Sequence, residues 1–263
     1  MTKNIRKIVT GLLIAIMATT VVYAETKEGS DVAQLKLIKT AMSSAVMIQN
    51  VTKAYLYAGN DIATTKAERE EVSALKVFDS RLKLLNESIN DPKMKNLLLF
   101  IESNREEIGD LLKEPYSLDN AQEIIDLAEA ISEGEFSIAN KIKAKLKGEV
   151  PAFKGQRYLV AQVAKYYIAY RSGIKDKNTI KNMNKSVEKL QALIEELKAY
   201  PQNTPEMNRI MNKIDKDWKI VHQFYLDIQD GDLPLIVYET TRKLDKKFLK
   251  YAQALLKSKE NTQ

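Results

Sequence analysis

A helical segment that occurs twice constrains the fold of this chain more than any other feature. Residues 47–56 (MIQNVTKAYL) return 112 positions later as residues 159–168 (LVAQVAKYYI). A spacing of this size is that of a small domain, so it predicts two copies of one module. Both copies place an amide near the middle of an apolar helix and a lysine, with aromatic residues after it, about one turn later.

Glycine and proline are scarce and lie almost wholly at breaks that cut the chain into roughly eight helices. Helix caps are expected at Ser117 or Asp119, at Thr204 ahead of Pro205, and at Asp232. We therefore expect an all-α fold of two tandem up-down four-helix bundles after a signal peptide. The expected units are residues 1–24 (signal peptide), 25–150 (first module) and 151–263 (second module).

The first helix of each module has more apolar surface than one bundle core needs. Residues 35–56 carry two apolar stripes at alternating three- and four-residue steps. Residues 158–170 are apolar nearly all round, with Gln162 and Lys165 as the strongly polar members apart from tyrosine hydroxyls. These helices are expected to pack beyond their own bundle, against the sister module or another subunit.

The N-terminus is typical of a secretory signal. Lys3, Arg6 and Lys7 precede an apolar run over residues 8–22, and a small-residue cleavage site ends at Ala24. We expect export to the periplasm and cleavage before Glu25, with an uncleaved membrane anchor as the alternative. No second run of this kind follows, so no transmembrane helix is expected in the mature chain.

Composition excludes several classes of function. The chain has no cysteine, which excludes disulfides, a lipidated cysteine, thiolate metal sites and covalent haem attachment. Without the signal peptide the balance is 38 Lys+Arg against 35 Asp+Glu, a net charge of +3. The charges alternate along helices rather than cluster, so no nucleic-acid partner is expected.

Residues 156–159 (QRYL), continued by residues 161–167 (AQVAKYY), resemble the signature Gly-Arg-Gln-Arg-Met-Leu-Ser-Gln-Arg-Met-Ala-Lys of the PilJ-type domain. This domain is the N-terminal sensing module of type IV pilus chemotaxis transducers and is related to the nitrate/nitrite-sensing domain of NarX-like kinases. The resemblance implies a periplasmic four-helix bundle. It also implies that the arginine at position 157 contacts an anion, in a site formed where the first helices of two subunits meet.

The sequence departs from this signature at several positions. Gly155 stands where the family's first arginine would be, and Gln162 replaces a later arginine. In the first copy, Ala45 stands opposite Arg157 and Asn50 opposite Gln162. A symmetric pair of arginines is therefore absent, and the resemblance implies at most an asymmetric half-site.

The candidate ligand-binding residues are Arg157, Gln162, Lys165, Gln49 and Lys53. A guanidinium can hold a small oxyanion by paired hydrogen bonds, but Arg157 at a helix start could also point into water. The amides of Gln49 and Gln162 are more often register-fixing groups in a bundle. Lys53 and Lys165 could supply charge to a ligand, but snorkelling to the surface along the alkyl stem is the expectation we favour.

Catalysis finds no support in the sequence. His222 is the only histidine, and no Glu-x-x-His pair or Gly-x-Ser-x-Gly turn occurs. We therefore expect no enzyme activity, no metal and no cofactor. Acidic runs such as residues 68–71 are expected to be solvated helix faces.

Two functions remain open. The first is a periplasmic sensing or binding protein whose first helices pair as an internal pseudo-dimer around a small anion, nitrate or nitrite being examples, or a small polar ligand. Its bound state would be read by the periplasmic part of a chemoreceptor or sensor kinase. The alternative is a ligand-free helical interaction module of an envelope, pilus or chemotaxis-linked assembly.

Overall fold

The structure is a computed structural model that describes residues 27–146, 155–175, 177–228 and 233–260. Within these ranges it contains eight α-helices and no strand, which confirms the all-α class. The expected signal peptide and the expected cap at Asp232 lie outside the described residues.

The helices are long, with short connections between them. Their bounds are α2 Lys27–Gly59, α3 Thr64–Ser88, α4 Pro92–Leu111, α5 Leu118–Lys143, α6 Gln156–Ser172, α7 Lys177–Lys198, α8 Pro205–Leu226 and α9 Pro234–Glu260.

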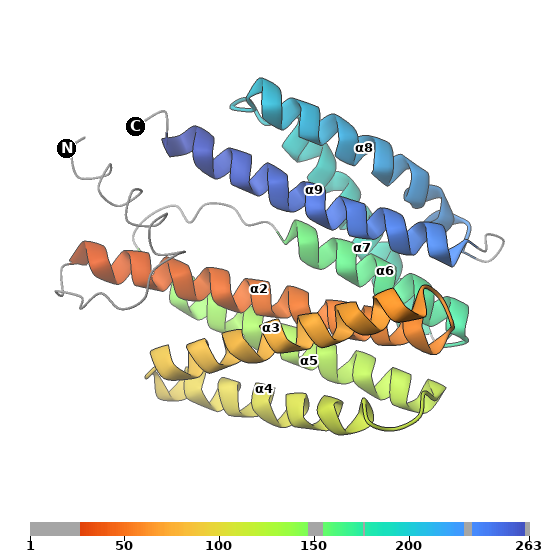
Figure 1. The fold of residues 1–263 in the computed structure, drawn as a ribbon. Coiled ribbons are helices and arrows are strands. Elements are labelled where there is room, and N and C mark those ends of the chain that lie inside the picture. Colours follow the sequence, from red (N-terminus) through yellow and green to blue (C-terminus); the bar gives the residue numbers. More distant parts are fainter. Residues whose placement is uncertain (1–26, 147–154, 176, 229–232, 261–263) are drawn as a thin grey trace.

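The helices pack in two groups of four that meet along α2 and α6. In the first group α2 contacts α3 and α5, and α4 contacts α3 and α5, which closes a ring. In the second group α6 contacts α7 and α9, and α8 contacts α7 and α9, which closes another. Extensive contact between α2 and α6 joins the groups, and Figure 1 shows α8 and α9 on the side of the molecule away from α3 and α4.

Helices α2 and α6 run side by side in the same direction and in register. The Asn60 side-chain amide donates a hydrogen bond to the Ser172 hydroxyl at 2.7 Å, and these residues lie 112 positions apart, which is the offset of the sequence repeat. Equivalent positions of the two copies therefore lie at the same level along the interface between α2 and α6, which we call the seam. Helices α2, α4, α6 and α8 all end at this end of the molecule (Figure 1).

Helix α2 contributes to both cores, with its middle in one core and its C-terminal end in the other. Ile48 and Val51 lie in the core of the first group, whereas Leu56 and Tyr57 lie in a core continuous with the second group. Eleven side chains of α6 between residues 159 and 170 are buried. This burial confirms the expectation that both first helices pack beyond their own bundle.

The helix starts follow local capping chemistry. The Ser117 hydroxyl accepts a hydrogen bond from the backbone amide of Asn120, and the Thr204 hydroxyl accepts one from Met207 ahead of α8. These contacts satisfy amides that have no partner inside the helix, and they confirm two expected caps.

Gly59, the last residue of α2, is held tightly against Tyr116. A Cβ atom at this position would lie 2.0 Å from the Tyr116 ring, so Gly59→Ala must displace a ring that also packs on Tyr55 at 5.3 Å. We expect a loss of about 1–3 kcal/mol in the free energy of unfolding measured with urea. The control is Gly109→Ala within α4, where only the end of the flexible Arg105 side chain is close and a gain of about 0.5–1 kcal/mol is expected. A Gly59 variant as stable as the wild type would contradict this packing.

Candidate functional site

Lys165 lies at the centre of a polar cluster between α5 and α6. Its side chain is fully buried, and its ammonium group donates to the Glu129 carboxylate and lies 4.2 Å from the centre of the Tyr166 ring. The Gln162 amide donates to Glu129 at 3.2 Å and to the Tyr158 hydroxyl at 3.0 Å. We call these residues, with Ser186, the Lys165 cluster; the Ser186 hydroxyl donates to Gln162 Oε1 at 2.8 Å.

Gln49 of α2 lies close to this cluster. Its amide donates to the Ser132 hydroxyl of α5 at 3.0 Å, one helical turn beyond Glu129. Ser132 is also a neighbour of the Tyr158 hydroxyl. A buried amide bonded to a facing helix fixes the relative register of the two helices, as the sequence suggested.

Lys53 lies in a second polar cluster, between α2, α3 and α9. Its ammonium group pairs with Glu70 Oε1 at 2.5 Å and donates to Asn50 Oδ1 at 3.2 Å. The second Glu70 oxygen accepts from the Tyr238 hydroxyl at 2.9 Å, with the Arg242 guanidinium 3.7 Å away. We call these five residues the Lys53 cluster.

The two clusters are related by the repeat but have their acid on different helices. The repeat places Asn182 of α7 opposite Glu70, and Asn182 donates to the Tyr166 hydroxyl instead of binding a lysine. The carboxylate for Lys165 comes from Glu129 of the other helix group. The Lys165 pair therefore connects the two groups directly, whereas Tyr238 and Arg242 connect them through Glu70.

Both acids are ionised by their surroundings. Burial alone would raise the pKa of Glu129, but the Lys165 charge and its hydrogen bond outweigh burial and lower that pKa. The pKa of Glu70 is lowered in the same way, by Lys53 against burial. Burial and the nearby Glu129 charge raise the pKa of Tyr158 and Tyr166, which keeps both phenols neutral.

Arg157 at the start of α6 belongs to neither cluster. Its guanidinium makes a two-pronged ion pair with Asp245 of α9, at 2.6 Å and 2.8 Å. Both side chains are about a quarter exposed. This planar, two-bond geometry is the one that a small oxyanion would use, and the carboxylate of Asp245 occupies it.

The structure thus brings together Gln49, Gln162 and Lys165, and places Lys53 and Arg157 in separate ion pairs. The prediction that the two lysines snorkel to the surface was wrong. Lys165 is completely buried and Lys53 is almost so, because each has a carboxylate within reach in the interior. An ammonium group that is paired with a carboxylate in the interior does not need to reach the surface for solvation by water.

The sequence analysis did not identify the three carboxylates that form ion pairs with these cations: Glu70, Glu129 and Asp245. The expectation that residues 68–71 form a solvated face was wrong for Glu70, whose side chain is about one-fifth exposed and ion-paired. A usable signal existed for Glu129, which lies one residue from Ala128 and three from Ser132 on the buried face of α5.

Glu135 is a buried carboxyl group of a different kind. It is fully buried on α5, and neither of its oxygens has a hydrogen-bond partner among the described residues. Burial raises its pKa to about 8, and the Ser44 hydroxyl and the Arg81 charge oppose this rise only in part. The group is therefore largely protonated at neutral pH.

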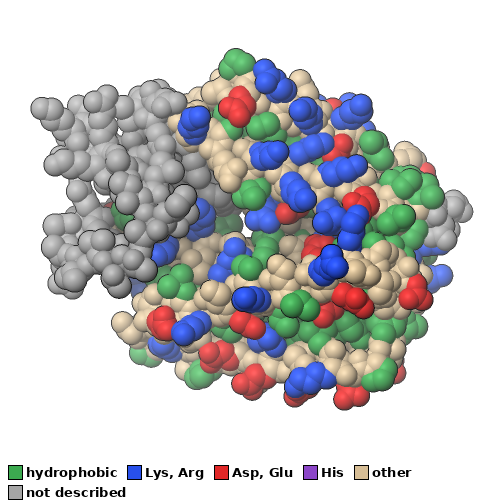
Figure 2. All heavy atoms as spheres, in the orientation of Figure 1, with side chains coloured by type: hydrophobic (Ala, Val, Ile, Leu, Met, Phe, Trp, Pro, Cys, Tyr) green, Lys and Arg blue, Asp and Glu red, His purple; other side chains and the backbone are tan. Residues whose placement is uncertain are grey.

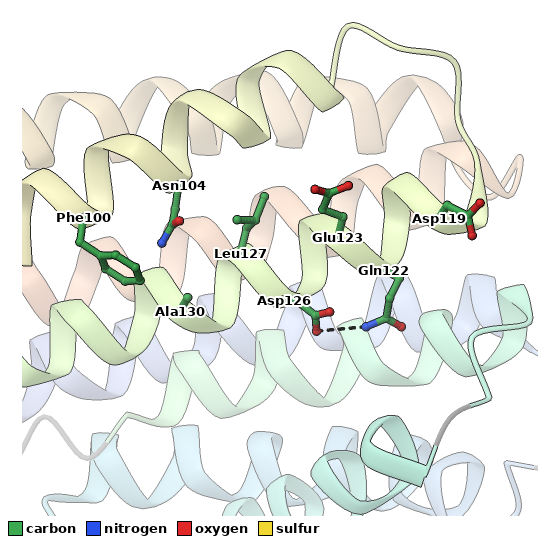
Figure 3. A pocket seen from close by; sticks show the side chains of 8 residues that line it. All are labelled: Phe100, Asn104, Asp119, Gln122, Glu123, Asp126, Leu127 and Ala130. Carbon is green, nitrogen blue, oxygen red and sulfur yellow. Dashed lines mark hydrogen bonds between the residues drawn. The ribbon is translucent and has the colours of Figure 1, made fainter.

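Two hollows on the described surface flank α4 and lie away from these clusters. The larger, of about 520 Å³, is an open groove between α4 and α5 (Figure 3). Its floor includes Phe100 and Leu127, and Asp119, Glu123 and Asp126 line it. None of the five candidate ligand-binding residues lines either hollow.

Other site types are not seen in the described part of the chain. Across it, no group of three or more His, Cys, Asp or Glu residues is placed to hold a metal ion. His222 packs against Trp218 with ring centres 5.0 Å apart. No described helix combines the length and the apolar character needed to cross a membrane.

No protein-family model matches the sequence, and no similar protein was found among curated proteins or solved structures.

The buried pair of Lys165 and Glu129 gives a direct test of the seam. Lys165→Met leaves Glu129 without its counter-charge, so we expect a loss of about 3–5 kcal/mol in the free energy of unfolding. The double variant Lys165→Met with Glu129→Met removes both charges and is expected to recover most of that loss. Lys113→Met, at a solvent-exposed pair with Asp110, serves as control and should change little. Equal losses in the single and double variants would show that the ion pair is not what Lys165 contributes.

Because the pKa of Glu135 is raised, we expect its contribution to the stability of the protein to fall as the pH rises. Between about pH 4.5 and pH 8 the native protein keeps the Glu135 proton while the unfolded chain has lost it, so raising the pH favours unfolding. Glu135→Gln cannot lose a proton, and its stability relative to the wild type should increase steadily over this range. The control is the exposed neighbour Glu133→Gln, which should track the wild type. Urea unfolding at several pH values measures this, and parallel curves for Glu135→Gln and wild type would refute it.

Proposed function

We propose that this chain is a helical interaction protein of the cell envelope, built from two tandem up-down four-helix modules of the PilJ-like kind. The observation that carries the proposal is that every cation of the candidate site has an internal carboxylate. Lys53 pairs with Glu70, Lys165 with Glu129, and Arg157 with Asp245. The helices packed around α2 and α6 supply these carboxylates from α3, α5 and α9.

An internal carboxylate competes strongly with a dissolved anion. Glu129 and Asp245 are tethered to the fold, so they face their cations without the translational entropy cost that a free nitrate ion must meet. Displacing Glu129 would also leave its charge unpaired in a largely buried position, at a cost of several kcal/mol. These costs favour a closed seam over an anion pocket.

The closed seam fits a fusion of two modules. In the PilJ-like and NarX-like families the first helices of two subunits meet, and here α2 and α6 meet within one chain. The hydrogen bond between Asn60 and Ser172 joins repeat-equivalent positions, which supports descent of both halves from one module. A fused pair needs no second subunit to cover its first helices.

The end of the molecule at which α2, α4, α6 and α8 end is the proposed contact surface for a helical partner. Large apolar side chains are exposed there, on α5, α8, α9 and the residue before α9: Leu118, Leu226, Leu233, Leu235 and Ile236. Apolar groups gathered at one end of a molecule are typical of a protein contact. The partner class that the family resemblance suggests is the periplasmic part of a chemoreceptor or sensor kinase.

A second candidate function is binding of a small polar ligand in the core beside the Lys53 cluster. The hydroxyl groups of Tyr57 and Tyr225 are buried without a hydrogen-bond partner in the described residues. They lie near each other, Tyr57 also lies near Glu70, and burial raises the pKa of both hydroxyl groups well above its usual value. Buried donors of this kind suit a small acceptor that lacks a strong negative charge.

Thermal unfolding of residues 25–263 with nitrate, nitrite, small carboxylates and small uncharged hydrogen-bond acceptors such as amides distinguishes the two functions. For the interaction protein we expect no shift of Tm beyond that caused by chloride at equal ionic strength. A ligand at a hundredfold excess over its Kd would add about 2.7 kcal/mol to the stability of the native state. Arg157→Ala and Tyr57→Phe are the matched variants. A shift for one compound that disappears in either variant would overturn the proposal in favour of ligand sensing and would locate the site.

A further inference from the structure

The outer face of the α8–α9 hairpin carries an unusual density of cations that have no carboxylate partner. Spaced three, four or seven residues apart along each helix, these side chains are exposed and make no ion pair within the described residues. We call them the basic face: Arg209, Lys213 and Lys216 on α8, and Lys243, Lys246, Lys250 and Lys257 on α9. At such spacings the residues of each helix lie in one stripe.

Most acids of the same two helices are already neutralised. Asp215 pairs with Lys198 and Lys219, and Asp217 pairs with Lys247. On α9, Asp245 is occupied by Arg157, and Glu239 pairs with Lys66 and Arg242. These pairs leave the cations of the basic face as the dominant unscreened charges, with Glu206 and Asp227 near the ends of α8.

The charge of the whole chain is divided between its halves. Residues 25–150 carry 17 Lys+Arg and 22 Asp+Glu, a net charge of −5, whereas residues 151–263 carry 21 and 13, a net charge of +8. Figure 2 shows Lys and Arg side chains crowded over α8 and α9, with acidic side chains more frequent in the half below. The expectation that charges do not cluster was therefore wrong, because the small net charge hid two opposite ones.

The basic face also exposes aliphatic side chains and lies on the outside of the helix pair. Ile220 on α8 and Leu249 on α9 are more than two-fifths exposed among the lysines, and Leu235 continues the α9 stripe towards the start of α9. We propose that the basic face docks on the surface of an anionic phospholipid bilayer.

Three features favour a bilayer over an acidic protein or a nucleic acid. Six of the seven cations are lysines, flexible point charges that suit a diffuse layer of lipid phosphates better than two-pronged recognition of carboxylates. Among the described residues of this face, none of the large exposed hydrophobic side chains is aromatic, so the face offers no stacking platform for bases. Aliphatic groups between lysines are typical of protein surfaces that rest in the lipid interface.

The opposite charge of the first helix group would orient the protein on such a surface. An anionic membrane attracts the basic face and repels the half that carries −5, which lies on the other side of the molecule. The protein would then lie with α8 and α9 against the headgroups and with the α4–α5 groove directed away from them.

Cosedimentation with vesicles tests the proposal, using residues 25–263 so that the apolar run at residues 8–22 cannot insert. We expect binding to vesicles that contain phosphatidylglycerol, little binding to pure phosphatidylcholine, and release at about 1 M salt, where the Debye length is about 3 Å. The triple variant Lys243→Glu, Lys246→Glu and Lys250→Glu should weaken binding by about a hundredfold.

The matched control reverses three exposed lysines of α7, Lys177→Glu, Lys181→Glu and Lys185→Glu, and so changes the net charge equally at another face. This variant should keep most of the binding, and thermal unfolding should confirm that both variants are folded. Equal losses in the two variants would reduce the effect to net charge and overturn the proposal. So would an absence of vesicle binding, including the case in which the protein instead self-associates at low salt through its oppositely charged halves.

Discussion

A fully buried lysine that keeps its charge needs a carboxylate within a few ångströms, and this requirement organises the contact between the two helix groups. Lys165 on α6 finds Glu129 on α5, and that choice ties the second helix group to the first. Lys53 on α2 finds Glu70, which in turn accepts from Tyr238 of α9. Such pairs add little net stability after desolvation, but a shift of one helix turn would break both, so they select a single register.

The same pairs decide what the seam can do chemically. A pocket for an anion needs cations that are not already paired. Here each candidate cation forms an ion pair with a carboxylate of the protein itself. The asymmetry of the acids is informative in itself. Glu70 pairs with a lysine of its own helix group, whereas Glu129 pairs with a lysine of the other group. The equivalent lysines of the two copies therefore have partners on different helices. Each pairing needs only one acid facing inward.

Local signals in the sequence were enough to predict the helices, the caps at Ser117 and Thr204, and the double burial of the first helices. These features depend on residues close together in the chain or on a periodic apolar pattern. The lysine partners were not predictable in the same way. The first module alone has 22 acids, and an apolar pattern does not say which of them turns inward. The repeat aligns Glu70 with Asn182, and this was one indication in the sequence. An acid in one copy and an amide in the other indicate that the side chain has a different partner in each copy.

The proposed fusion of two modules also accounts for outer faces of different charge. In a dimer of identical subunits, a mutation that adds charge to one outer face adds it to both, so the faces cannot take opposite signs. Once both copies lie in one chain, only the α2–α6 seam must stay complementary, and the remaining helices can change independently. The acidic groove beside α4 and the cations along α8 and α9 lie on opposite sides of that seam. Under the proposed fusion, the charge difference follows from joining the copies, and it makes the two sides of the molecule unlike in a way that a symmetric dimer does not allow.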